Sequence, residues 1–144
     1  MSLREEFAQN IVKVLKDMQD PKPVLVTREP FDVEKLAISQ FPAILISTGN
    51  ETREDVSMKS ILRQGTIQYT IRAFVRGGGA MIDRLKNDII ERIEETLDLD
   101  RTRGTGNRNM LTRVISITVP DRLQPLAEVL ITVEVRYVYQ KGQN

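Results

Sequence analysis

The stretch AEVLITVEVRYVY, residues 127–139, has an apolar period of two along its whole length, with mostly polar side chains at the positions between. Every second position is apolar, and these positions are Ala127, Val129, Ile131, Val133, Val135, Tyr137 and Tyr139. The positions between them include Glu128, Thr132, Glu134 and Arg136. Because successive side chains of a strand point to opposite faces of a sheet, the pattern predicts a strand with one fully buried face. The fold must therefore supply an apolar layer against that face.

Four other stretches have the composition or the spacing of strands. Residues 41–47, FPAILIS, are short, apolar and rich in branched side chains, and a Gly-Asn pair follows them. Residues 66–73 and 111–119 alternate between apolar and polar positions. Residues 24–27 predict one more short strand. The sheet is therefore expected to have about four to five strands.

Two stretches repeat apolar residues at the spacing of an α-helix. The first places six on one face, namely Leu3, Phe7, Ile11, Val14, Leu15 and Met18. Ser2 and Glu5 form a Ser-x-x-Glu capping box at its start, and Pro21 ends it because proline lacks an amide hydrogen. The second follows three glycines at residues 77–79 and repeats Ile82, Leu85, Ile89, Ile93 and Leu97. Both helices are predicted to be amphipathic.

The order of these elements predicts an α+β fold with a mixed or mainly antiparallel sheet. Since each helix has one apolar face, both are expected to pack on one face of the sheet. Between the first two strands, Asp32 predicts the cap of a single helical turn over residues 34–38. Neither a repeat nor a linker rich in Pro, Gly or Ser divides the sequence. Residues 1–144 are therefore expected to form a single domain.

The composition argues against most kinds of enzyme. The chain has 144 residues, with 21 basic and 20 acidic side chains and neither cysteine nor histidine. Such a sequence has no thiolate nucleophile, no imidazole base and none of the most common zinc ligands. The near balance of charge gives no overall attraction to nucleic acid or to an anionic membrane. We therefore expect no catalytic activity, cofactor, metal or membrane association, and no specific binding of nucleic acid.

Two features that look like ligand sites are better explained by local structure. Residues 77–79 precede a helix, as phosphate-binding loops do, but a P-loop needs a lysine followed by Ser or Thr, and alanine follows here. We expect a strand-to-helix turn. Glu51, Glu54 and Asp55 lie among basic neighbours in a segment without a clear period, so no catalytic pair is expected. The three tyrosines fall on predicted apolar faces, which suits the core or a subunit contact better than stacking on RNA bases.

Two polar segments are expected to project from the domain as arms, at about residues 49–63 and 101–109, and the first is expected to be an exposed arm or a hairpin. Both have few apolar side chains to offset the roughly 1 to 2 kcal/mol per residue that ordering a backbone costs. We expect them to be mobile in the free subunit and ordered only against a partner. The residues predicted to contact a subunit or partner are Arg53, Glu54, Lys59, Arg63, Arg101, Arg103 and Arg108.

The order of segments also resembles that of a known family. A helix and a short strand lead to FPAILI at residues 41–46, a charged arm follows, and a long strand ends at Arg76-Gly77. An amphipathic helix then ends in LDLDRTRG at residues 97–104, and two strands close on YVY at residues 137–139. This layout, over nearly the whole chain, is similar to that of the tail terminator family of tailed bacteriophages. The resemblance assigns no functional residue.

The resemblance implies a homo-oligomeric ring, expected to be a hexamer, that caps the tail tube, ends its polymerisation and joins it to the head. The implied partners are the tail tube protein and the head–tail connector protein, with a sheath contact as a further option. The implied location is the virion tail or neck, with assembly in the host cytoplasm. Three alternatives stay open: a head-completion or connector ring protein, an RNA-binding α+β module, and a small enzyme that uses only arginines and carboxylates.

Overall fold

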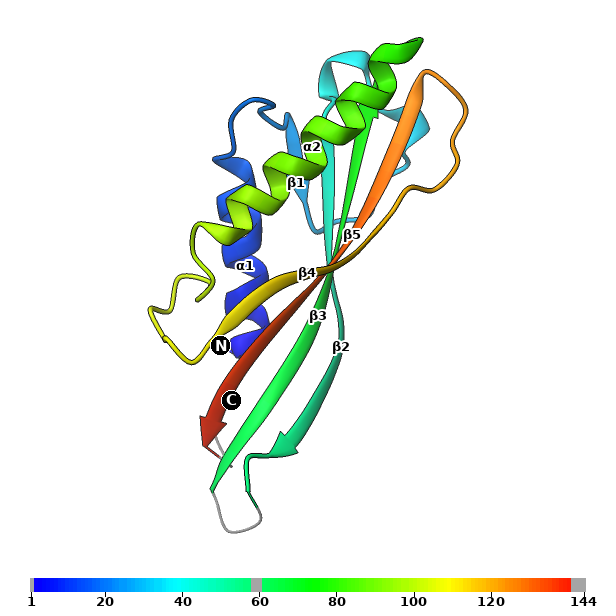
Figure 1. Cartoon of the computed structure of the whole chain (residues 1–144). Helices are drawn as coiled ribbons and strands as arrows, with labels where there is room; N and C mark the ends of the chain where they lie inside the picture. Colours follow the sequence, from blue (N-terminus) through cyan, green and yellow to red (C-terminus); the bar gives the residue numbers. More distant parts are fainter. Residues whose placement is uncertain (1, 58–60, 141–144) are drawn as a thin grey trace.

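A computed structural model of the chain describes residues 2–57 and 61–140 (Figure 1). The helices and strands are α1 (Leu3–Lys16), β1 (Leu25–Thr27), β2 (Ala43–Asp55), β3 (Leu62–Arg76), α2 (Ala80–Asp98), β4 (Leu111–Thr118) and β5 (Leu126–Gln140). Two 3₁₀ turns, η1 (Val33–Lys35) and η2 (Ile38–Gln40), connect β1 to β2. They replace the single turn predicted over residues 34–38. The predicted α+β fold is confirmed.

The five strands form one mixed sheet in the order β1-β2-β3-β5-β4. β1 is parallel to β2, and all the other pairs are antiparallel. β3 is the central strand, and it pairs with β5 along its whole length, from Leu62 opposite Gln140 to Arg76 opposite Leu126. One edge of the sheet is β4. The other is formed by the short β1 and, beyond it, by β2.

Both helices pack on one face of the sheet, as the sequence predicts (Figure 1). Phe7 and Ile11 of α1 and Ile89 and Ile93 of α2 share one apolar core with alternate residues of β3 and β5. The apolar face of β5 is buried throughout, and its members are Ala127, Val129, Ile131, Val133, Val135, Tyr137 and Tyr139. The side of the sheet that these residues occupy is the helix face. The opposite side is the open face.

A second, smaller apolar cluster covers one end of the open face. Val33 packs there against Ala43 and Phe74, and the ring of Phe31 meets that of Phe74 edge-on at 5.6 Å. These residues come from β2, β3 and the segment between β1 and β2. Further along β3, the same face carries the exposed side chain of Gln68. The segment before β2 therefore covers the sheet only at the end where β1 lies.

The first predicted arm, residues 49–63, belongs mostly to the sheet. β2 continues to Asp55, which pairs with Arg63 of β3. A β-bulge between Thr48 and Glu51 shifts the register and interrupts the alternation by which the strand would have been recognised. The expected arm or hairpin is thus a hairpin of two paired strands, and the prediction that only a partner would order this segment is wrong for its described residues. The part of β2 and β3 beyond the bulge, residues 50–55 and 62–67, is named the blade, and Figure 1 shows it running on past both helices.

Candidate interaction site

A buried carboxylate ties the blade to α1 and to β5. The Glu51 side chain lies on the helix face and is only 6% exposed. One oxygen accepts a hydrogen bond from Arg4 Nη1 of α1 at 2.8 Å. The other accepts from Arg53 Nε at 2.8 Å and from the Tyr137 hydroxyl at 2.6 Å. Arg4 also donates to the carbonyl oxygen of Gly49, in the bulge, at 3.1 Å. Three elements thus meet at one anion.

The surroundings of Glu51 keep its carboxylate ionised. Burial alone would raise the pKa of Glu51, but the hydrogen bonds from Tyr137, Arg4 and Arg53 outweigh burial and hold that pKa below its ordinary value. Burial and the bond to Glu51 raise the pKa of the Tyr137 hydroxyl, so it stays protonated and donates. The sequence suggested an exposed Glu51, and its burial corrects that prediction. The arrangement makes Glu51 an anchor of the blade.

Aromatic rings extend this anchor along the blade. Phe7 of α1 meets the Tyr137 ring edge-on at 5.5 Å, and Tyr137 lies 5.5 Å from Tyr139. The Arg53 guanidinium lies 5.2 Å from the centre of the Tyr139 ring, within range of a cation–π interaction. Tyr137 lies across Gly65 of β3, where a Cβ atom would come within 2.5 Å of the ring. Only glycine leaves room for this packing.

The surface of the blade carries three of the predicted contact residues, Arg53, Glu54 and Arg63. Arg63 pairs with Asp55 at 2.9 Å, and Glu54 is exposed on the open face. Lys59 lies outside the described residues. The tip also exposes apolar side chains, 40–60% of each, and these are Val56, Ile61 and Leu62. Exposed apolar side chains bordered by charges are typical of contact surfaces.

The second predicted arm, residues 101–109, is a folded loop between α2 and β4. The Asp100 carboxylate accepts hydrogen bonds from the amides of Thr102 at 2.9 Å and Gly104 at 3.1 Å. The Thr102 hydroxyl oxygen accepts another from the amide of Gly106 at 3.0 Å. These bonds satisfy the backbone of the loop from within. The prediction that its contacts must come from a partner is therefore wrong.

Arg103, predicted to contact a partner, is buried instead. Its side chain is 3% exposed, and its backbone has φ of 50°. Nη2 donates to the carbonyl oxygen of Leu97 at 2.7 Å and to that of Asp100, so Arg103 caps the C-terminal end of α2. Burial lowers the pKa of the guanidinium, and neighbouring aspartates act against that shift. The predicted contact role of Arg103 is wrong, whereas Arg101 and Arg108 are exposed.

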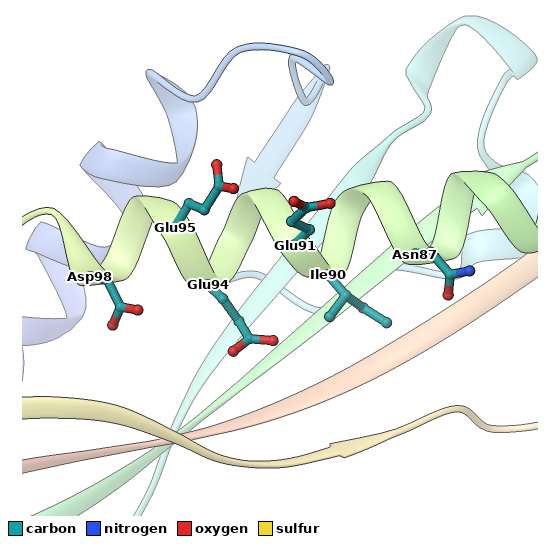
Figure 2. Close-up of a pocket in the computed structure, with 6 residues that line it drawn as sticks. All are labelled: Asn87, Ile90, Glu91, Glu94, Glu95 and Asp98. Carbon is teal, nitrogen blue, oxygen red and sulfur yellow. The ribbon is translucent and has the colours of Figure 1, made fainter.

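The free edge of β4 is bordered by carboxylates of α2. Figure 2 shows Asn87, Ile90, Glu94 and Asp98 along one side of α2, and Glu91 and Glu95 projecting from the other. A cavity of about 300 Å³ lies between α2, the loop and β4, and its lining residues are Glu94, Asp98, Arg101, Leu111, Thr112, Arg113 and Val114. Within residues 2–57 and 61–140, Glu94 and Asp98 form no ion pair. This cavity is named the α2–β4 groove.

The same edge exposes apolar side chains. Ile115, Ile117 and Val119 are 39–46% exposed. A second bulge, between Val114 and Ser116, lies in this strand. Sequence reasoning found the strand but not that it is an edge, because pairing order is set by contacts far apart in the chain. An uncovered apolar edge strand is a surface on which another strand can pair.

Sequence reasoning also missed a second buried carboxylate, Glu128, which fastens the loop between β4 and β5. Its side chain is 4% exposed and accepts hydrogen bonds from Arg72 Nη1 and Arg122 Nε, each at 2.7 Å. The Arg122 guanidinium also lies 5.4 Å from the centre of the Phe74 ring. The next residue, Leu123, is 91% exposed. The only signal in the sequence was an acid in a strand, and the pattern placed it on a polar face.

Other candidate chemistry is accounted for by the fold. The glycines at residues 77–79 form the predicted turn into α2, with Gly79 at φ of 58°. No group of three or more metal-binding side chains occurs in the described residues. None of the helices in that part of the chain is long and apolar enough to cross a membrane. Scans of the sequence against protein-family models and against curated proteins found no match.

Proposed function

We propose that this chain is a structural subunit that assembles with copies of itself into a ring, in the tail or neck of a bacteriophage. The observation that carries the proposal is the pair of free sheet edges, β4 and the blade, on opposite sides of one sheet. Copies that join through two different surfaces are related by a rotation, and they close into a ring when that rotation divides a full turn. Each copy here offers two such surfaces.

The anchors behind these surfaces support the same function. Glu51 fixes the blade to α1, Arg103 fixes the loop beside the α2–β4 groove, and Glu128 fixes the loop after β4. Ordered surfaces lose little conformational entropy when they associate, so more of the contact energy appears as affinity. A subunit that must join two neighbours at once benefits from this at both edges.

The order of segments favours the tail terminator role. The chain runs α1, β1, β2, β3, α2, β4 and β5, the layout on which the resemblance to that family rests. In that role a ring, expected to contain six copies, caps the tail tube, stops its polymerisation and joins it to the head connector. The partners are then the tail tube protein and the head–tail connector protein. A head-completion or connector ring protein is the alternative that uses the same edges.

The test is the assembly state of the full chain. Light scattering and electron microscopy of the purified protein, alone, mixed with isolated tail tubes and mixed with isolated head connectors, are expected to show a closed ring in at least one sample. A ring seated on the tube end supports the terminator role, and a ring bound only to the head connector supports the alternative. A monomer in every sample contradicts the proposal. A gel shift with RNA that weakens steeply with salt would instead favour the nucleic-acid module.

A further inference from the structure

We infer that the ring is closed by strand pairing, in which the blade edge of β2 in one copy adds antiparallel to β4 of the next, with Glu54 opposite Arg113. This inference rests on the proposed ring and names its contact. It needs two edges that are free, directions that match, and side chains that suit each other on both faces of the joined sheet. The structure meets each requirement.

Neither edge is paired with a further strand among residues 2–57 and 61–140. β4 is the last strand of the sheet and pairs only with β5. β1 covers only the first three residues of β2, so the outer side of the blade has no strand partner. Residues 52–55 are exposed. Unpaired strand edges of this kind pair readily with a strand from another copy.

The directions of the strands require antiparallel pairing. β2, β3, β5 and β4 each run antiparallel to the next, so β2 and β4 point in opposite directions. A neighbour placed so that its sheet continues the first sheet keeps the same orientation. Its β2 therefore meets β4 antiparallel. In such a pair one opposed couple of residues fixes the positions of all the others nearby.

Charges on the open face select the register. Glu54 lies opposite Gln64 in its own sheet, and Arg113 lies opposite Glu134, so both Glu54 and Arg113 are on the open face. Both are exposed. Arg113 makes one ion pair within its own copy, to Glu134 at 3.3 Å. Opposing Glu54 to Arg113 across the junction adds a second carboxylate to that guanidinium, which has five N–H donors.

The same register matches charges on the helix face. With Glu54 opposite Arg113, the next couples are Arg53 opposite Val114 and Asp55 opposite Thr112. Val114 and Thr112 line the α2–β4 groove together with Glu94, Asp98 and Arg101. Arg53, which pairs with Glu51 in its own copy, is thus placed next to a groove lined by two carboxylates, and Asp55, which pairs with Arg63, is placed next to one lined by an arginine. Opposite charges directly across a junction stabilise a strand pair.

Other pairings at these edges fit less well. Glu54 and Arg113 are held on the open face by their own sheets, so only slips of an even number of residues keep the two helix faces on one side. A slip of two residues would place Glu54 opposite Leu111 and remove its charged partner across the junction. Pairing of β4 with β4 of another copy about a twofold axis would bring Glu94 and Asp98 of both copies to one interface. Like charges there would repel. The β2–β4 junction is the arrangement in which every charged neighbour has a partner of opposite sign.

Cysteine cross-linking tests the register directly. The chain has no cysteine, so the double variant Glu54→Cys with Arg113→Cys carries one new thiol at each edge. Within one copy two strands, β3 and β5, separate these positions. Mild oxidation of the full chain in its ring is expected to give a ladder of linked copies on a denaturing gel. Each single variant carries one thiol per copy and can therefore link at most two copies. A double variant that also gives nothing larger than linked pairs would overturn the inference.

Charge reversal tests the contact by its energy. Glu54→Arg alone and Arg113→Glu alone are each expected to weaken ring formation about tenfold or more, and the two together in one chain to restore much of it. Glu29→Arg and Arg84→Glu, exposed and outside both edges, are matched controls expected to leave assembly unchanged. Circular dichroism of each variant checks that it has folded.

The outcomes separate the inference from the proposed function. Rings that form but neither cross-link through these positions nor respond to either reversal overturn the strand pairing and leave the ring intact. A wild-type chain that forms no ring alone or on the tail tube contradicts both. Single reversals that weaken assembly without recovery in the double variant show that both edges matter but that Glu54 does not face Arg113, and this also overturns the stated register.

Discussion

The blade and the loop between α2 and β4 are both polar, and both are ordered, but by different kinds of bond. In the loop the partners are close in sequence, since Asp100 binds amides two and four residues ahead. In the blade they are remote, since Arg4 and Tyr137 lie 47 and 86 residues from Glu51. Polar composition therefore does not by itself predict disorder. A sheet ladder with one buried ion can offset the entropy of ordering, and so can a set of short local bonds.

The two designs should also fail differently. The blade depends on a single carboxylate that serves three donors, so its loss affects α1, β2 and β5 together. The loop is stabilised by several hydrogen bonds to its backbone and by one buried arginine, so no single bond holds it. Substitutions at Glu51 and Arg103 test this contrast through the free energy of unfolding, measured at concentrations where the chain is monomeric.

The largest effect is expected from Glu51→Ala. Removing a buried carboxylate leaves its hydrogen-bond donors without an acceptor, which costs about 3 to 5 kcal/mol for a fully buried pair. Arg4 and Arg53 are 36% and 39% exposed, so water recovers part of the cost, and we expect a loss of about 2 to 3 kcal/mol. Urea unfolding measures it. The control Glu54→Ala, on the exposed side of the same strand, is expected to change stability by less than about 0.5 kcal/mol. Equal losses in the two variants would show that Glu51 is not an anchor.

Arg103→Ala is expected to cost less, about 1 to 2 kcal/mol, through the lost cap of α2. Arg103 Nε and Nη1 are buried and have no hydrogen-bond partner in the described residues. The cost of burying these two groups offsets part of the stability that the cap contributes in the wild type. Hydrogen exchange is expected to quicken in the last turn of α2 and in the loop, and to stay unchanged in the blade. Faster exchange in the blade would contradict the independence of the two regions.

The sequence was informative where the pattern is local and periodic. Residues 127–139 and both helices were predicted because alternation and helical spacing show their buried faces directly. The strand alternation of the blade was not recognised because one extra residue at the bulge breaks the period. Pairing order, and with it the free edge at β4, depends on contacts across the whole chain and leaves no local trace.

The contact residues show the same limit. Arg101, Arg103 and Arg108 look alike in sequence, yet Arg103 is buried and the other two are exposed. The useful signal was the backbone rather than the charge. Asp100 followed by Thr102 and Gly104 is typical of a side chain that caps its own loop, and such a loop folds back on the helix end. A buried arginine near a helix C-terminus has carbonyl oxygens to bind.

Acid is expected to loosen the blade. The folded-state pKa of Glu51 is lowered, so its stabilising effect is fully present above the pKa of the unfolded chain and is lost as pH falls through the folded-state pKa. The stability gap between wild type and Glu51→Gln is therefore expected to be largest near neutral pH and to shrink below about pH 4. Urea unfolding at a series of pH values measures it. A gap that grows as pH falls would contradict the assignment.

The smallest effect on stability, and the sharpest contrast in assembly, is expected from the two exposed arginines of the loop. Arg101→Glu and Arg108→Glu both change a solvated charge, so each should alter unfolding by less than about 0.5 kcal/mol. Their positions differ. Arg101 lines the α2–β4 groove, where the inferred pairing brings Asp55 of the next copy, whereas Arg108 does not line it. Arg101→Glu should therefore weaken ring formation, and Arg108→Glu should leave it unchanged. Light scattering across a range of concentrations compares them at matched stability. Equal weakening in both variants would place the contact on the whole loop, and no weakening in either would move it away from this end of β4.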